Sequence, residues 1–182
     1  MGASVACELC MSILTHDEIL KEIAAGNIQV DPFDPSCVGP ASIDLHLGNE
    51  FRVFRKVHDV VHVTPDTNYE EITDRIIVKD RLLLMPQETV LGITVEKIIL
   101  APNFCGWLEG RSRFSRLGLL VHISASFMQP GIENKQCLEI SNFSPTPMAL
   151  YPGTPICQFI FQRTIGEAKY QGKFRNQKEG NF

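Results

Sequence analysis

A short basic stretch, Gly110-Arg-Ser-Arg-Phe-Ser-Arg116, gathers three guanidinium groups and two hydroxyls immediately after a glycine. Guanidinium is well suited to phosphate oxygens, because its planar fork donates two parallel charge-assisted hydrogen bonds. A loop that carries Arg111, Arg113 and Arg116 could therefore hold a di- or triphosphate. The alternative is a solvated basic loop whose arginines pair with surface acids such as Glu109, and composition alone leaves both interpretations open.

A second residue with catalytic potential is Glu139, which lies in the strand-like run Cys137-Leu-Glu-Ile140. Alternation along a strand would point Leu138 and Ile140 to one face, and Cys137 and Glu139 to the other. A glutamate in such a position most often faces solvent. Beside buried apolar residues, however, a carboxylate can act as a general base or acid near neutral pH. The sequence alone does not choose between these two situations.

The histidines and cysteines do not form a recognisable metal site. His16-Asp-Glu18 matches half of the zinc deaminase signature, but that signature requires a P-C-x-x-C downstream. The CxxC of this chain, Cys7 to Cys10, lies upstream. We therefore expect no zinc, and there is no G-x-S-x-G nucleophile elbow. Cys105, Cys137 and Cys157 lie in apolar segments and are expected to be small buried hydrophobes with free thiols.

Composition predicts a soluble protein with one domain. Its 182 residues suffice for a single core, and the sequence has no apolar run long enough for a membrane span. The formal net charge of −4 argues against general nucleic-acid binding, which needs a broad basic surface. The start does not resemble a secretory signal, so we expect a cytoplasmic location. Residues 1–10 are expected to be a disordered extension.

The rest of the pattern must supply the elements that hold these residues. Thr15-x-x-Glu18 is a capping box, in which each side chain satisfies the other residue's backbone donor, and it predicts a helix that ends at Gly26. Residues 43–47 then alternate between apolar and polar, which predicts a strand, and Gly48-Asn49 predicts a turn. Further short strands are expected at residues 51–54, 60–63, 75–78, 82–85, 89–94, 97–100, 117–123, 136–141, 147–151 and 156–161.

Many short strands punctuated by proline and glycine indicate a mainly β fold, a sandwich or barrel with one short helix in front. We expect this β domain to span residues 11–165. Residues 166–182, called the tail below, are polar and contain glycine. Such a segment is expected to be flexible unless something orders it.

Five blocks of the chain resemble the sequence signatures of the dCTP deaminase family. Gly110 to Ile123 is similar to the family's G-R-S-S-L-x-R-L-G, which is followed by an apolar V-H-V/I strand. Val38 to Phe51 resembles its G-x-S-x-D-x-x-L-G-x-x-F segment, and Gln129 to Asn142 resembles D-P-G…L-E-x-x-N. Ala149 to Gln158 resembles A-L-x-P-G with I-x-Q, and Ala168 to Tyr170 resembles the family's A/S-K-Y. The blocks run in order, from about residue 11 to about residue 177.

This resemblance implies a distorted, jelly-roll-like β-barrel of the dUTPase type (the β-clip fold). It also implies a homotrimer whose active sites lie between neighbouring subunits. The implied reaction is the hydrolytic deamination of dCTP to dUTP and ammonia, which supplies dUMP for thymidylate synthesis. The family uses no zinc, Mg²⁺ accompanies the triphosphate, and TTP is the implied inhibitor.

The resemblance also implies roles for particular residues. Glu139 would take a proton from the water that attacks C4 of cytosine, while Ser112 and Arg116 position that water and the developing charge. The tail would close over the nucleotide and exclude water. The residues implied in substrate binding are Arg111 and Arg113 at the phosphates, Ser115, Ala125 at the base edge, Gln129, Cys137, Leu138, Lys169 reaching the phosphates, Tyr170 and Gln171.

Three positions depart from the family pattern. Arg113 replaces the second serine of G-R-S-S and would bind phosphate by charge, and Lys173 stands where the family often has glutamine. Gln129 replaces the aspartate of D-P-G, whose counterpart supports triphosphate hydrolysis in dUTPases and bifunctional deaminases. Because glutamine cannot act as a base, a deaminase that stops at dUTP is the favoured reading. The alternatives are a bifunctional enzyme that forms dUMP and pyrophosphate, a dUTPase, and a non-catalytic nucleotide sensor.

Overall fold

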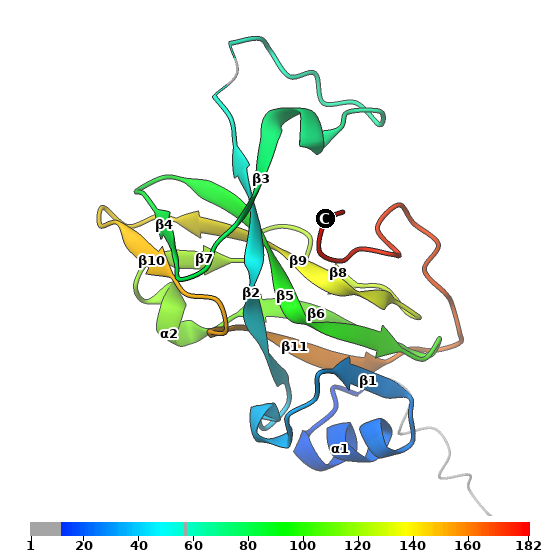
Figure 1. The fold of residues 1–182 in the computed structure, drawn as a ribbon. Helices are drawn as coiled ribbons and strands as arrows, with labels where there is room; N and C mark the ends of the chain where they lie inside the picture. Colours follow the sequence, from blue (N-terminus) through cyan, green and yellow to red (C-terminus); the bar gives the residue numbers. More distant parts are fainter. Residues whose placement is uncertain (1–11, 57) are drawn as a thin grey trace, which may run out of the picture.

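The computed structural model describes residues 12–56 and 58–182 (Figure 1). The predicted extension 1–10, with Cys7 and Cys10, lies outside the described residues. The helical elements are α1 (His16–Ala24), η2 (Pro35–Cys37), η3 (Tyr69–Ile72) and α2 (Ser112–Ser115). The strands are β1 (Ile28–Asp31), β2 (Ile43–Phe54), β3 (Thr73–Ile77), β4 (Leu82–Leu84), β5 (Thr89–Leu100), β6 (Phe104–Gly110), β7 (Leu119–Val121), β8 (Phe127–Met128), β9 (Glu133–Asn142), β10 (Met148–Leu150) and β11 (Pro155–Arg163).

Most of the strands belong to one curled, antiparallel sheet. Its order is β7-β9-β5-β2-β11-β6-β8, with β1 added to β5 and β3 added to β2. Strands β10 and β4 form a separate two-stranded sheet. The helix α1 lies at one end of the large sheet, near β1 (Figure 1). The predicted mainly β fold with one short helix in front is therefore confirmed.

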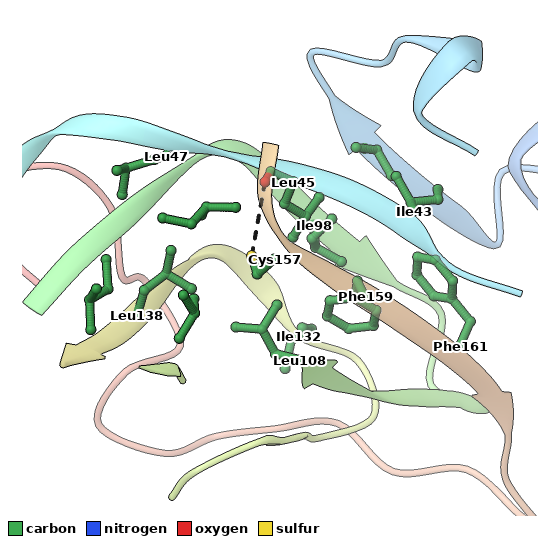
Figure 2. Close-up of a cluster of buried hydrophobic side chains, with 14 of the residues drawn as sticks. Ile43, Leu45, Leu47, Ile98, Leu108, Ile132, Leu138, Cys157, Phe159 and Phe161 are labelled. Atoms are coloured by element: carbon green, nitrogen blue, oxygen red, sulfur yellow. Dashed lines mark hydrogen bonds between the residues drawn. The ribbon is translucent and has the colours of Figure 1, made fainter. Parts of the chain in front are cut away.

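The core fills the inner face of the curled sheet. Every second residue of β2 from Ile43 to Leu47 is buried, as the alternation predicts. These side chains pack with apolar residues of β5, β6, β9 and β11, including the rings of Phe159 and Phe161, whose centroids lie 4.7 Å apart (Figure 2). Burial of one such side chain stabilises the fold by about 1.5–3 kcal/mol. The two cysteines Cys105 and Cys157 are buried with free thiols, as expected.

The predicted turn at Gly48-Asn49 is wrong, because β2 continues through both residues to Phe54. The pairing of β2 with β5 shifts register between Leu47 and Phe51, which marks a bulge. A Cβ at position 48 would lie only 2.7 Å from the carbonyl oxygen of Ile93. The glycine therefore allows two backbones to approach closely and does not turn the chain.

Other strand predictions need correction as well. Residues 60–63 form no strand, and Val60 and Val63 are 80% and 93% exposed. The two runs predicted at 89–94 and 97–100 are one strand, β5, in which the register shifts once against β9. The strands β1, β6 and β8 were not predicted from the pattern, because each is short or interrupted by glycine.

Helix α1 begins after Thr15 and ends before the left-handed Gly26, as predicted. The capping box itself does not form, because the Thr15 side chain makes no capping hydrogen bond. The buried face instead includes Glu22, whose carboxylate accepts hydrogen bonds from Asn27 and Arg163. No helix within the described ranges is long and apolar enough to cross a membrane.

Gly106 of β6 provides a test of the packing. A Cβ at this position would overlap the carbonyl oxygen of Ile160 and the ring of Phe159. We expect Gly106→Ala to lower the free energy of unfolding by about 2–3 kcal/mol, because neither the backbone nor the buried ring can yield without repacking. Urea denaturation measures this change. Gly39→Ala is the matched control, since its nearest neighbours would lie 3.5 Å or more away, and a comparable loss there would contradict the explanation.

Candidate active site

A cavity of about 390 Å³ lies between β5, β8, β9 and the tail. Its walls are mainly apolar and aromatic, with a few polar groups, which is the usual make-up of a small-molecule site. The lining residues are Tyr69, Leu91, His122, Ala125, Phe127, Met128, Gln129, Ile132, Asn134, Gln136, Cys137, Glu139, Tyr170, Phe174, Gln177 and Phe182.

Glu139 is placed in this cavity by the register of the sheet. It lies on β9 directly opposite Leu91 of β5, and the alternation of β9 puts Cys137 on the same face. Its carboxylate is half-buried and accepts hydrogen bonds from two backbone N–H groups, those of Ile123 (3.1 Å) and Ser124 (2.8 Å). The Ser124 hydroxyl lies 3.0 Å from both carboxylate oxygens. These donors fix the orientation of the carboxylate.

The same contacts leave the Glu139 carboxylate with a free lone pair that can accept a proton. A carboxylate offers about four lone-pair positions on its two oxygens. Two backbone N–H groups and one hydroxyl proton occupy at most three of them. An oriented carboxylate with a free lone pair can accept a proton from a water molecule in the cavity, which is what general base catalysis requires.

His122 lies beside Glu139 and was not singled out by the sequence pattern. Its backbone N–H donates to the carbonyl oxygen of Glu139 at 2.8 Å, and its φ of 62° is a left-handed conformation that residues other than glycine rarely adopt. Both ring nitrogens are buried and have no hydrogen-bond partner among the described residues. The ring therefore presents unsatisfied polar atoms at the wall of the cavity.

The tail forms another wall of the cavity. Backbone N–H groups of Ala168 and Tyr170 donate to the carbonyls of Pro102 and Pro130. Further along, Lys135 and Gln177 exchange two hydrogen bonds, of 3.0 and 2.8 Å, at the part of β9 that β7 does not cover. Figure 1 shows the tail returning along the sheet toward β3 and β9. Four tail side chains consequently line the cavity.

The basic stretch 110–116 lies apart from this cavity. Arg111 pairs with Asp44 at 2.9 Å and donates to the carbonyl oxygen of Pro155 at 2.8 Å. The next residues form the single turn α2, in which Ser112, Arg113 and Ser115 are exposed, as is Arg116 after it. None of these residues lines the cavity, and none bonds to the Glu139 carboxylate.

Comparison with known proteins identifies the family. Residues 13–164 of this chain match the model of a protein family that is described as "dCTP deaminase-like". The chain belongs to the dCTP deaminase-like family.

Several curated relatives carry the name "dCTP deaminase, dUMP-forming", and two of them illustrate the match. One, from Nocardioides sp., is 36% identical over 175 residues, which cover 91% of each chain. The other, from Mycolicibacterium vanbaalenii, is 39% identical over 160 residues, which cover 87% of this chain and 84% of the relative. Among solved structures, the 2′-deoxycytidine 5′-triphosphate deaminase of Agrobacterium tumefaciens matches with a TM-score of 0.67 and 19% identity over 84% of this chain and 48% of that one. The chain spans about half the length of that protein, and the likeness supports the fold alone.

In this dCTP deaminase-like chain, the cavity brings together five of the residues predicted from the sequence. They are Ala125, Gln129, Cys137, Glu139 and Tyr170. The remaining predicted residues lie elsewhere: Arg111, Ser112, Arg113, Ser115 and Arg116 around α2, and Lys169 and Gln171 on the exposed side of the tail. Leu138 is fully buried in the core, so its side chain cannot contact a substrate and only its backbone is available.

Cys137 is half-buried with a free thiol and lines the cavity, so it is not the fully buried core residue that its apolar segment predicts. Burial, with a smaller contribution from Glu139, raises the pKa of the Cys137 thiol to about 12. The thiol is therefore protonated at neutral pH, and a protonated thiol is a poor nucleophile. Among the residues of this cavity, Glu139 is the group best placed for proton transfer.

Proposed function

We propose that this chain is a bifunctional dCTP deaminase, which converts dCTP and two water molecules to dUMP, ammonia and pyrophosphate. The observation that carries the proposal is the oriented Glu139 carboxylate in an apolar cavity of a dCTP deaminase-like chain. The choice of dUMP over dUTP rests on the curated relatives, which are named dUMP-forming at 36% and 39% identity. They favour this alternative over the deaminase that stops at dUTP, which the sequence pattern favoured.

In the deamination step, Glu139 accepts a proton from water as the water oxygen bonds to C4 of cytosine. The C4=N3 π electrons move to N3, which takes that proton from Glu139. The C4–N4 bond then breaks as the new C4 hydroxyl gives up its proton and becomes the carbonyl of uracil, and N4 leaves as ammonia after it receives that second proton. The backbone N–H groups of Ile123 and Ser124 hold the carboxylate in place throughout. This is general acid–base catalysis by one carboxylate that first takes and then returns a proton.

The second step breaks the bond between the α- and β-phosphates. A water oxygen bonds to the α-phosphorus, and pyrophosphate leaves. Gln129 lies in the cavity but cannot accept the proton of that water, although its amide can hydrogen-bond the sugar. Pyrophosphate release in this chain must therefore use a base other than residue 129.

We propose that a second copy of the chain supplies Ser112 and Arg116 to each cavity, as in a homotrimer with shared active sites. Within one chain these residues do not line the cavity and make no hydrogen bond to the Glu139 carboxylate. Apolar side chains flank α2: Leu117 is 61% exposed and Phe143 is 74% exposed. A groove of about 220 Å³ between α2 and β10 is lined mainly by apolar residues. Exposed apolar surface of this kind is typical of an interface between subunits.

Magnesium is proposed to enter with the triphosphate. The part of the chain that the structure describes contains no cluster of three or more His, Cys, Asp or Glu side chains that could hold a metal ion. Mg²⁺ commonly binds through substrate phosphates, one or two carboxylates and several waters. The described side chains therefore fit an Mg²⁺ ion that is bound through the substrate phosphates better than one that is held by protein ligands alone. Inhibition by TTP remains a prediction.

The products formed from dCTP test the proposed function. Purified protein with dCTP and Mg²⁺ is expected to release dUMP, ammonia and pyrophosphate in equal amounts. Release of ammonia while dUTP accumulates would instead support the hypothesis of a deaminase that stops at dUTP. Tight binding of dCTP without any product would support the non-catalytic sensor, and pyrophosphate released from dUTP but not from dCTP would indicate a dUTPase.

A further inference from the structure

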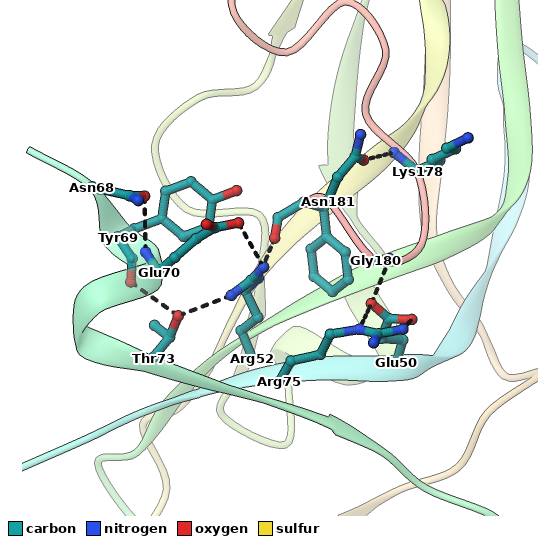
Figure 3. A network of polar contacts seen from close by, with 11 residues as sticks. Glu50, Arg52, Asn68, Tyr69, Glu70, Thr73, Arg75, Lys178, Gly180 and Asn181 are labelled. Atoms are coloured by element: carbon teal, nitrogen blue, oxygen red, sulfur yellow. Dashed lines mark hydrogen bonds and ion pairs between the residues drawn. The ribbon is translucent and has the colours of Figure 1, made fainter. Parts of the chain in front are cut away.

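Two opposite charges are buried at neighbouring outward positions of β2. Glu50 and Arg52 are only 3% and 6% exposed, while Phe51 between them points into the core. Residues on this face would be wet if nothing covered the strand. Charged side chains are almost never buried this deeply unless they are paired. The coverage comes from η3 and from the end of the tail (Figure 3).

Glu50 is bonded on both oxygens. The Arg75 guanidinium donates to Oε1 at 2.6 Å and to Oε2 at 2.8 Å. The backbone N–H of Gly180, in the tail, donates to Oε1 at 2.7 Å. The Arg75 contact is the main reason why the pKa of the Glu50 carboxyl lies below its usual value, with a smaller contribution from Gly180. The carboxylate thus joins β3 to the tail.

Arg52 holds the tail two residues further on. Its Nε donates to the carbonyl oxygen of Phe182, and its other nitrogens donate to Glu70 at 3.0 Å and Thr73 at 3.4 Å. The guanidinium carbon also lies 5.2 Å from the centre of the Tyr69 ring and 5.9 Å from that of Phe182. Hydrogen bonds that involve a charged group are the stronger ones. One buried cation therefore fixes two aromatic residues of the cavity wall.

The anchors and the candidate base share one face of the sheet. Arg52 lies opposite Leu91 of β5, and Leu91 lies opposite Glu139 of β9. Opposed residues on neighbouring strands point to the same face, and two strand spacings are about 10 Å. Phe182, which Arg52 holds, is 1% exposed and lines the cavity. The residue that binds the end of the tail, Arg52, therefore lies on the same face of the sheet as the candidate base Glu139.

We propose that Glu50 and Arg52 are positioning residues that hold tail residues 174–182 as one wall of the nucleotide cavity. They act on the substrate through the tail and do not touch it. The part of this proposal that concerns dCTP rests on the proposed function. Loosening the wall removes contacts that substrate and transition state share, so it raises KM and leaves kcat nearly unchanged.

Hydrogen exchange and kinetics together test the proposal. Arg52→Lys keeps the charge but cannot make the forked contacts. Gly180→Pro removes the backbone N–H that donates a hydrogen bond to Glu50, and proline cannot adopt the left-handed φ of 87°. This variant leaves the sequence of β2 unchanged. In both variants we expect backbone amides of residues 174–182 to lose protection at least about tenfold, while β5 and β9 keep theirs. KM for dCTP is expected to rise at least about fivefold, with kcat changed by less than about twofold.

Arg81→Lys is the matched control, because Arg81 pairs, among the residues that the structure describes, only with the exposed Asp80 beside it. Unchanged tail exchange in Gly180→Pro, or a loss of kcat with KM unaltered, overturns the proposal. If Arg52→Lys does not fold, the tail variant alone decides. If the wild-type protein does not turn over dCTP, the proposed function fails, and the exchange experiment still decides whether Glu50 and Arg52 anchor the tail.

Discussion

Glu139→Gln is expected to lower kcat for deamination of dCTP at least about 10³-fold, because proton transfer by a positioned side chain contributes about 10²–10⁴-fold and this is the only such group proposed for the attacking water. Glutamine has nearly the same shape, and its amide oxygen can still accept from the backbone N–H of Ser124. We therefore expect KM to change little. Steady-state kinetics of ammonia release measures both constants.

Glu133→Gln is the control for this experiment. Glu133 lies on the same strand, β9, but its side chain is 56% exposed and pairs with Lys97 at 2.8 Å on the surface. The same chemical change there should leave kcat within about twofold of the wild type. If the Glu139→Gln variant keeps more than about a tenth of the wild-type kcat, Glu139 is not the general base.

A mixture of two inactive variants is expected to recover activity. Glu139→Gln lacks the proposed base, and Arg116→Ala, which lacks the charge after α2, should lose at least about 10²-fold in kcat. If each cavity takes Glu139 from one copy and Arg116 from its neighbour, random assembly in a cyclic oligomer leaves about a quarter of the cavities intact. Co-folding the two variants should therefore restore about a quarter of the wild-type rate.

This experiment depends on where α2 lies. Within one chain, Ser112 and Arg116 are exposed and do not line the Glu139 cavity. A mixture whose rate equals the mean of the two separate variants would show that the chain which supplies Glu139 also supplies Arg116. That result would contradict the shared site. Size-exclusion chromatography of the wild type and of each variant is the control that they assemble alike.

The sequence pattern predicts the parts of the fold that depend on local alternation. Residues 43–47 and 136–141 were expected to be strands, and both lie within strands of the sheet. The pattern failed where glycine serves a contact distant in sequence. Gly48 looks like a turn, but it admits the carbonyl of Ile93, 45 residues away in the chain, and no local pattern contains that partner.

The site follows the same rule. Glu139 could be predicted, because one strand and one sequence block carry it. Tyr69 and Phe182 could not, since they meet at the cavity only after the tail folds back over residues that lie far from it in sequence. Arg111 was predicted to contact phosphate, and the structure pairs it with Asp44, 67 positions earlier, which the basic stretch alone does not reveal.

The ratio of pyrophosphate to ammonia, measured as the purified protein first turns over dCTP in the presence of Mg²⁺, tests the central claim most directly. A bifunctional deaminase releases one pyrophosphate for each ammonia, leaves dUMP, and accumulates no dUTP. We predict a ratio of about one from the start of the reaction. A ratio near zero, with dUTP increasing in step with ammonia, would contradict the claim, and so would pyrophosphate without ammonia.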